Sequence, residues 1–236
     1  MKRAVVLAGG KGTRLRPYTV TLPKPLMPIG EYPILEVIVR QLRKEGFEWI
    51  TLAVNHQADL FRAFFGDGSK WGLKIDYSLE SKALSTIGPL KLIGDLPEHF
   101  LVMNGDILTD VRYGEFLAAH IEEDRLFTIS AAARNQRIDY GVLKTTEDSV
   151  LCGFEEKPSI PFLVSMGVYA VSRRVLDAIP VDQAFGFDDL VLGFLGEGER
   201  VVAVPHDGYW LDIGRPDDYE RAIDDWPELS KKLALG

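Results

Sequence analysis

The stretch AGGKGTRLRPYTVTLPKP, residues 8–25, contains the residues best suited to chemistry. It follows the apolar run at residues 4–7 and combines a cluster of glycines with Arg14 and Lys24. Glycines let the backbone approach a ligand closely and point N–H groups at phosphate oxygens. An arginine can fork onto phosphate oxygens, and a lysine adds a point charge from the far end of the loop. The stretch therefore predicts a phosphate-binding loop, and a surface turn with incidental basic residues is the alternative.

Neither common phosphate-binding motif fits this loop. A P-loop needs G-x-x-x-x-G-K-[ST], but here Lys11 precedes Gly12 and no G-K-[ST] occurs in the stretch. A dinucleotide fingerprint needs G-x-G-x-x-G, and its third glycine position holds Leu15. The spelling therefore disfavours both a P-loop enzyme and a dehydrogenase.

Two aspartates from distant parts of the chain are candidates for a metal site. Asp106 follows the strand-like run FLVMNG, and Asp212 lies within the apolar segment WLDI. In open α/β sheets ligands bind beyond the carboxyl ends of strands, and a buried unpaired charge is unfavourable. A turn or helix cap at Asp106 and an ion pair of Asp212 with Arg215 are the structural alternatives. Convergence on one Mg²⁺ would explain both aspartates, because Mg²⁺ favours a few carboxylates plus phosphate oxygens and water.

Residues 7–17 and the Lys24-Pro25 pair resemble the signature of the sugar-1-phosphate nucleotidylyltransferases, roughly L-A-G-G-x-G-T-R-L-x-P, a spacer, then K-P. Asp106 resembles the aspartate of the family's N-G-D segment, and Asp212 resembles that of its W-x-D-I-G segment. The resemblance therefore implies Mg²⁺ held by Asp106 and Asp212, and catalytic roles for Arg14, Lys24, Asp106 and Asp212. It also implies that the nucleotide is bound by Leu7, Ala8, Gly9, Gly10, Gly12, Thr13, Arg14, Ser85, Thr86, Gly88, Asn104 and Gly105.

Further segments extend the resemblance to the sugar side. The E-K-P at residues 156–158, the Y-G at residues 140–141 and the segment VSMGVY are similar to family segments that contact the sugar. In the last of these, Ser165 stands where the family commonly has asparagine, which leaves the sugar open. The implied sugar-phosphate-binding residues are Lys24, Gly141, Glu156, Lys157 and Ser165. A solvated hairpin tip is the alternative for residues 156 and 157.

The segment ESKALSTIGPL resembles the family's base-reading loop, often spelled L-G-T-A-G-P-L. Ser85 and Ile87 replace its usual glycine and alanine, and a hydroxymethyl group at position 85 would crowd the place where backbone meets base. The nucleotide therefore stays open at this loop. A plain loop-to-helix junction is the alternative, with Ser85 or Thr86 as the helix N-cap.

The implied reaction joins an NTP to a sugar 1-phosphate and releases pyrophosphate. Nucleophile and leaving group are both anionic phosphates, so alignment and charge neutralisation suffice and no general base is required. The segments PILEVIVRQL, STIGPL and GYWLDIGRPDDY most resemble mannose-1-phosphate and heptose-1-phosphate guanylyltransferases, which favours GTP. The alternatives are a uridylyl- or thymidylyltransferase acting on glucose 1-phosphate or another hexose 1-phosphate, and a non-catalytic sugar-nucleotide sensor.

Strand-like and helix-like segments alternate along the first half of the chain, which predicts an α/β fold with a mostly parallel sheet flanked by helices. The family that the chain resembles has such a Rossmann-like fold. Strands are expected at residues 3–8, 49–55, 74–80, 100–106, 126–133, 162–172 and 200–206, with a hairpin turning at 147–148. Helices are expected at residues 33–47, 57–65, 88–97, 111–124, 173–179, 187–195 and 216–226.

One nucleotidyltransferase domain, residues 1–236, is the economical interpretation of this organisation. It would consist of a nucleotide-binding lobe at about residues 1–112 and a smaller sugar-binding and metal-completing lobe at about 113–236. No C-terminal β-helix extension is expected.

Charge and composition limit the partners. The net charge of -8 argues against a nucleic-acid binder. Residues 1–30 contain six basic and no acidic side chains, which predicts a local cationic patch for a small polyanion. The single cysteine, Cys152, excludes an internal disulfide and a multi-cysteine zinc site, and we expect it in the core. The four histidines show no metal-ligand spacing.

The N-terminal apolar run is too short for a signal peptide, and no stretch approaches the roughly 18 apolar residues that span a bilayer. A cytoplasmic protein without membrane partners is therefore expected, and self-association stays open.

Overall fold

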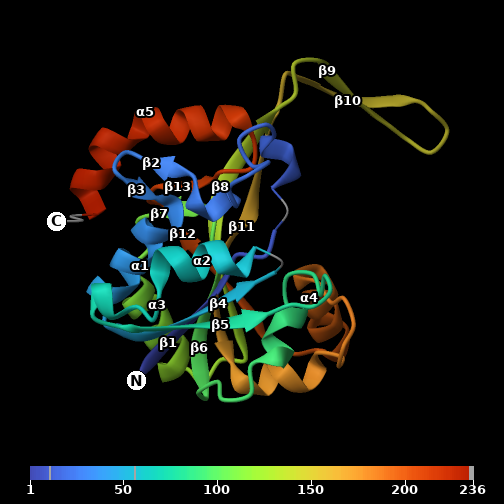
Figure 1. The fold of residues 1–236 in the computed structure, drawn as a ribbon. Helices are drawn as coiled ribbons and strands as arrows, with labels where there is room; N and C mark the ends of the chain where they lie inside the picture. Colours follow the sequence, from blue (N-terminus) through green and yellow to red (C-terminus); the bar gives the residue numbers. More distant parts are fainter. Residues whose placement is uncertain (11, 56, 234–236) are drawn as a thin grey trace.

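The computed structural model describes residues 1–10, 12–55 and 57–233, and a seven-stranded sheet forms its centre (Figure 1). The strand order is β12–β8–β11–β6–β1–β4–β5. β11 is antiparallel to both of its neighbours, and the other neighbouring pairs are parallel. The strands are β1 (Lys2–Leu7), β4 (Phe47–Val54), β5 (Lys74–Leu79), β6 (His99–Asn104), β8 (Phe127–Arg137), β11 (Ser159–Ser172) and β12 (Val201–His206).

Three two-stranded sheets and two kinds of helix complete the described chain. The small sheets pair β2 (Pro28–Ile29) with β3 (Tyr32–Pro33), β7 (Ile107–Thr109) with β13 (Trp210–Asp212), and β9 (Gly141–Thr145) with β10 (Leu151–Glu156). The α-helices are α1 (Ile34–Lys44), α2 (Ala58–Phe65), α3 (Tyr113–Glu122), α4 (Phe187–Glu197) and α5 (Pro216–Leu233). The 3-10 helices are η1 (Thr13–Leu15), η2 (Lys24–Leu26), η3 (Ser69–Trp71), η4 (Gly88–Leu92) and η5 (Arg173–Ala178). Within the described ranges, no helix has the length and apolarity needed to cross a bilayer.

Alternate residues of the central strands supply two separate hydrophobic cores. In β1, Ala4 and Val6 pack in a core that includes residues of α1, α2 and α3. Val5 points to the opposite face, where it joins residues of η4, η5 and α4. A sheet covered on both faces buries its strands completely, which explains their nearly continuous apolar runs. The expected α/β fold with a mostly parallel sheet is confirmed, whereas its division into lobes stays a prediction.

The last helix is longer than expected. α5 continues past Trp226 and through Pro227 to Leu233, although a proline inside a helix costs about 3 kcal/mol. Leu229 and Leu233 are buried in a third apolar cluster beneath α5. Burying a leucine contributes about 1.5–3 kcal/mol, so two leucines are enough to offset the proline. The helices expected at residues 88–97 and 173–179 are short 3-10 turns instead.

The β9–β10 ribbon projects from the body of the molecule (Figure 1). Within the described part of the chain its strands pair only with each other, and apolar side chains such as Leu143 and Phe154 are exposed on it. Cys152 lies on β10 and is also exposed. The expectation of a core cysteine is therefore wrong, because a two-stranded ribbon without a covering layer leaves both of its faces in solvent.

Candidate active site

The centre of the sheet contains a switch in strand order. β1 lies between β4 and β6, and Leu7 at its end pairs with Ala53 on one side and Asn104 on the other. Ligands of open α/β sheets bind beyond the carboxyl ends of the strands at such a point. A cavity of about 670 Å³ lies there, lined in part by the glycine loop and by residues that follow β4, β5 and β6.

All predicted nucleotide-binding residues line this cavity except Gly88 and Gly105. Gly105 lies directly beneath the glycine loop, where its N–H donates to the carbonyl of Leu7 at 2.9 Å. A Cβ at this position would lie 3.1 Å from that carbonyl oxygen, so a side chain would disturb the contact. Gly88 is buried, and its N–H donates to the carbonyl of Phe185 at 3.0 Å.

The glycine loop is anchored at its far side by Leu15. Leu15 is fully buried and packs with residues of β13 and α5. Thr19 adds a second tie, because its hydroxyl donates to the carbonyl of Gly12 at 2.6 Å. Leu15, which stands where a dinucleotide fingerprint needs its third glycine, thus anchors the glycine loop to the hydrophobic cluster beneath α5. Arg14, next to it, is exposed and lines the cavity.

Lys24 extends from η2 into a carboxylate pair. η2 follows Pro23 and holds Pro25 in its first turn, which restricts the backbone around the lysine. Lys24 is buried, and its Nζ lies 2.6 Å from Oδ2 of Asp106 and 3.9 Å from Oδ1 of Asp212. The ion-pair partner of Asp212 in the described structure is therefore Lys24, and the alternative of a pair with Arg215 is wrong.

The two aspartates are brought together by the β7–β13 pairing. Asp212 pairs in register with Ile107, which follows Asp106. Burial, and then the negative charge of Asp106, raises the pKa of Asp212 above its ordinary value. The side chain of Asp212 is nonetheless 47% exposed, so the apolar residues on either side of it do not enclose it.

The donor set fits a divalent cation. One ammonium faces two carboxylates, and Oδ1 of Asp106 is buried without a hydrogen-bond partner among the described residues. The described ranges contain no cluster of three or more histidine, cysteine or acidic side chains arranged to hold a metal. Asp106 and Asp212 would therefore supply two ligands, and phosphate oxygens and water the rest, as Mg²⁺ commonly prefers.

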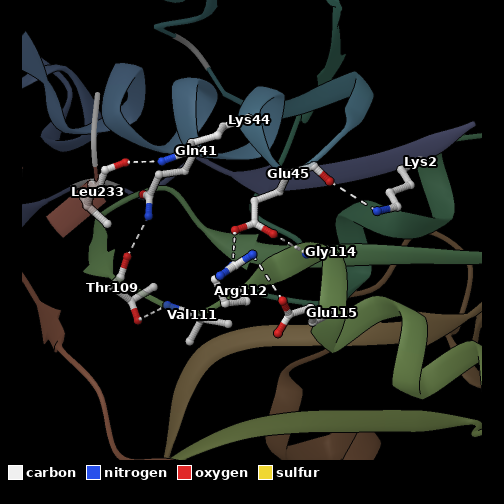
Figure 2. Close-up of polar contacts among 10 residues, drawn as sticks. All are labelled: Lys2, Gln41, Lys44, Glu45, Thr109, Val111, Arg112, Gly114, Glu115 and Leu233. Carbon is white, nitrogen blue, oxygen red and sulfur yellow. Dashed lines mark hydrogen bonds and ion pairs between the residues drawn. The ribbon is translucent and has the colours of Figure 1, made fainter. Parts of the chain in front are cut away.

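The base of this site is tied to α1 and α5 (Figure 2). Gln41 donates from its side-chain amide to the carbonyl of Thr109, the last residue of β7, at 2.7 Å. Lys44 donates to the carbonyl of Leu233 at the end of α5, at 2.9 Å. Glu45 accepts from Arg112 at 3.0 Å, which fixes the segment after β7. The strand that directly follows Asp106 is thus tied to α1, and α1 is tied in turn to the end of α5.

Two cavity residues, Asn55 and Glu80, were not predicted as site residues. They directly follow β4 and β5, and the side-chain amide of Asn55 donates to the carbonyl of Gly9. Oε2 of Glu80 accepts the N–H of Leu84 at 3.2 Å, and burial raises the pKa of Glu80. Their position directly after two strand-like segments could have marked them as candidates, because the carboxyl ends of parallel strands meet at one edge of the sheet.

The loop at residues 81–88 is fastened to the segment before α4. The hydroxyl of Thr86 accepts the N–H of Phe187, the first residue of α4, at 2.8 Å. Lys82 forms an ion pair with Asp182 at 2.7 Å. The hydroxyl of Thr86 therefore accepts a backbone N–H at the start of α4. The N-cap residue of η4 is Ile87, which makes no side-chain cap, so the alternative that Ser85 or Thr86 caps this helix is wrong. Ser85 has a φ of 65°, in the region that favours glycine.

Of the predicted sugar-phosphate-binding residues, Lys24 lines the cavity, and the other four lie outside its lining. Gly141 pairs with Glu156 across the β9–β10 ribbon, and Lys157 follows that ribbon; all three are exposed. Ser165 is exposed on β11, and its hydroxyl donates to the hydroxyl of Tyr169 at 3.1 Å. Their part in sugar binding stays a prediction.

The basic residues of the N-terminal segment do not form one patch. Arg3 is only 1% exposed, and it contacts Asp95 at 2.9 Å and the ring of Trp49. Lys2 donates to the carbonyl of Glu45. Both residues lie at the start of β1 (Lys2–Leu7), about 13–17 Å from its carboxyl end at the usual rise per residue of a strand. The prediction that Lys2 and Arg3 belong to a local cationic patch is therefore wrong. Lys11 lies outside the described residues.

The proteins that this chain resembles are nucleotidyltransferases. A family model described as "Nucleotidyl transferase" matches residues 3–228. A UTP–glucose-1-phosphate uridylyltransferase of Synechocystis sp. is 34% identical over 94% of this chain and 62% of its own length. A mannose-1-phosphate guanylyltransferase of Mycobacterium tuberculosis is 32% identical over 94% of this chain and 64% of its own length. The chain thus spans less than two thirds of these curated relatives.

Solved structures share the fold. HddC from Yersinia pseudotuberculosis, complexed with GMP-PN, superposes with a TM-score of 0.73 and 28% identity over 96% of this chain and 100% of its own. A putative glucose-1-phosphate thymidylyltransferase from Bacillus anthracis has a TM-score of 0.76 and 22% identity over 95% of this chain and 94% of its own. The second likeness concerns the fold alone.

Proposed function

The chain belongs to the nucleotidyl transferase family, and from this premise we propose that it transfers a nucleotidyl group from an NTP to a sugar 1-phosphate, releasing pyrophosphate. The family that the glycine loop predicted is thereby confirmed. GTP with mannose or heptose 1-phosphate is the substrate pair that we favour. The observation that carries the proposal is the convergence of Lys24, Asp106 and Asp212 beside the cavity that the glycine loop lines.

Charge and alignment would do the catalytic work. The glycine-loop amides and Arg14 would hold the nucleotide phosphates, and Arg14 would steady the pyrophosphate as it leaves. Lys24 lines the nucleotide cavity and contacts both aspartates, and it would hold the two reacting phosphates in line. Mg²⁺, held by Asp106 and Asp212, would neutralise charge on the α-phosphate. A sugar 1-phosphate is already an anionic nucleophile, so the site requires no base to deprotonate it.

The β9–β10 ribbon would contribute the sugar side. Glu156 ends β10 and Lys157 follows it, so a carboxylate and an ammonium lie at the base of the ribbon. A carboxylate accepts hydrogen bonds from sugar hydroxyls, and an ammonium pairs with the sugar phosphate. Because Glu156 and Lys157 are exposed and lie outside the lining of the cavity, the proposal requires that the bound sugar reach toward them.

Glu80 supports the preference for GTP. Its carboxylate lines the nucleotide cavity and, when ionised, can only accept hydrogen bonds. Guanine presents two neighbouring donors, N1–H and the N2 amino group, whereas uracil and thymine present one N–H on that edge. One oxygen of Glu80 already accepts the N–H of Leu84, which fixes the carboxylate in place. A fixed acceptor group in the cavity therefore matches guanine better than uracil or thymine.

A second substrate pair is favoured by a specific finding. The uridylyltransferase of Synechocystis sp. is 34% identical to this chain, so UTP with glucose 1-phosphate is the alternative. A non-catalytic sensor is less favoured, because a sensor would not need to keep Lys24, Asp106 and Asp212 together. A cytoplasmic location and self-association stay predictions.

Pyrophosphate release from a matrix of NTPs against hexose and heptose 1-phosphates, with Mg²⁺ present, tests the proposal. We expect release from GTP only when a mannose- or heptose-type 1-phosphate is added, and reactions without the sugar phosphate are the control. Turnover confined to UTP and glucose 1-phosphate would replace the favoured pair by the alternative. If no combination released pyrophosphate, the proposed transferase activity would be contradicted and a non-catalytic sensor would be favoured.

A further inference from the structure

Lys24 lies where the two carboxylates would share a divalent cation. Its Nζ is 2.6 Å from Oδ2 of Asp106 and 3.9 Å from Oδ1 of Asp212, and its side chain is 8% exposed. An ammonium at this distance from a carboxylate forms a charge-assisted hydrogen bond, which is among the stronger polar contacts in proteins. The lysine therefore already supplies one positive charge to this pair of carboxylates.

Lys24 contacts Oδ2 of Asp106, whereas Oδ1 is buried and has no hydrogen-bond partner among the described residues. The side chain of Asp106 as a whole is 26% exposed. A cation that binds Asp106 through Oδ2 would meet the ammonium of Lys24 there. Mg²⁺ binds carboxylate oxygens at about 2.0–2.1 Å, so a cation bridging Asp106 and Asp212 would fall close to the present position of Nζ.

Two cations cannot share this space without strong repulsion, because the site is partly buried and screens charge poorly. We propose that Lys24 and the divalent cation compete for Asp106, and that cation binding releases the ammonium of Lys24 into the nucleotide cavity. The proposal rests on the proposed function for the presence of a metal at Asp106 and Asp212.

The cavity offers the released ammonium a suitable partner. Lys24 lines the cavity together with Gly12, and a Cβ on Gly12 would lie 3.4 Å from Cβ of Lys24. The freed ammonium would thus face the loop whose amides are proposed to hold the nucleotide phosphates. A nucleotide supplies phosphate oxygens to both cations at once, so it should make the exchange favourable. The protein alone should therefore bind the metal weakly, and the nucleotide should strengthen that binding.

Manganese affinity measured by electron paramagnetic resonance, without nucleotide or sugar, tests the competition. We expect Lys24→Met to bind Mn²⁺ about tenfold tighter than the wild type, because a neutral side chain of similar length removes the competing charge. Lys24→Arg keeps the charge and should stay near the wild type. Adding Asp106→Asn to Lys24→Met should abolish the gain. Equal or weaker binding by Lys24→Met, or an unchanged gain in the double variant, would overturn the proposal.

A second measurement on the wild type covers the case in which Lys24→Met does not fold. Reductive methylation read by mass spectrometry reports how accessible each lysine amine is. Adding Mn²⁺ should increase methylation of Lys24 several-fold while leaving Lys44, which is held by the carbonyl of Leu233, unchanged. Unchanged methylation of Lys24 at saturating Mn²⁺ would overturn the release step.

Neither measurement involves turnover, so their outcome is separate from that of the substrate matrix. A silent matrix with a positive manganese result would reject the proposed reaction and retain the competition. Pyrophosphate release in the matrix, together with no effect of Lys24→Met on manganese affinity, would support the proposed reaction and reject the competition.

Discussion

Asp212 on β13 pairs in register with Ile107 on β7, the residue that directly follows Asp106. This antiparallel pairing brings together two carboxylates from opposite halves of the chain, and Lys24 contacts both. The pairing is made by backbone hydrogen bonds, so it does not depend on the charge of either aspartate. The site can therefore be altered chemically while its frame stays in place.

Asp106→Asn should lower turnover by about a hundredfold or more, because the loss of one preorganised electrostatic group in an active site commonly has that effect. Pyrophosphate release with the preferred substrates measures the loss, and circular dichroism checks the fold. Asp59→Asn on α2 is the matched control, since Asp59 is 95% exposed and pairs only with Arg62 among the described residues. Turnover of Asp106→Asn at the wild-type rate would contradict the metal role.

Glu80→Gln should lower kcat/KM for GTP by roughly tenfold to a hundredfold, because a hydrogen bond to a charged group contributes about 1.5–3 kcal/mol. An amide cannot accept both donors of guanine, so activity with UTP should change far less. The ratio of the two kcat/KM values is the measurement. Glu98→Gln, at the opposite end of the sheet, is the control, and an unchanged ratio in Glu80→Gln would refute base reading by Glu80.

Ser85→Gly should stabilise the fold by up to about 1 kcal/mol. Ser85 has a φ of 65°, where a side chain costs about 1–2 kcal/mol relative to glycine, and the greater freedom of unfolded glycine offsets part of the gain. Urea unfolding of both proteins measures the difference. Ser81→Gly in the same loop should be destabilising, because the described structure gives Ser81 no positive φ. A loss of stability in Ser85→Gly would show that the hydroxyl makes a compensating contact.

Stability should fall as the pH drops from about 6.5 toward about 4, because His120 stays neutral in the folded protein. Its side chain is 0% exposed, and burial lowers the pKa of His120 to about 4. The unfolded chain takes up a proton below about pH 6.5 that the folded chain refuses, so the slope approaches about 1.4 kcal/mol per pH unit and levels off below about pH 4.

His120→Gln isolates this contribution, since the amide can keep a hydrogen bond to Thr128 but does not titrate. Urea unfolding across this pH range should show a shallower dependence for the variant than for the wild type. Identical slopes would show that His120 is not the group responsible.

The sheet and most helices could be predicted because burial on both faces leaves a clear apolar pattern in each central strand. Pro227 misled the prediction of α5, because a local rule about proline takes no account of Leu229 and Leu233 packing beneath the helix. Cys152 was misplaced for the opposite reason: its strand pairs in a ribbon that no layer covers. Both errors concern tertiary packing, which local patterns do not record.

The candidate site could be predicted in part. The glycine loop and the two aspartates are spelled out in short motifs, whereas Glu80 and Asn55 are ordinary residues until the strands before them are placed side by side. The contact between Lys24 and Asp106 could not be predicted from the sequence either, because it joins two segments 82 residues apart that only the fold brings together. Motifs thus identified the residues that carry charge, and the fold was needed to show which charges meet.

The exposed position of Cys152 allows a probe to be attached to the β9–β10 ribbon. It is the chain's single cysteine, and it lies on the projecting ribbon, near the residues proposed to hold the sugar. A thiol-reactive fluorophore would therefore attach at one known place without any engineering. Its emission could follow the ribbon in real time as nucleotide, metal and sugar phosphate are added in turn, which makes the native thiol a built-in reporter for the order of assembly.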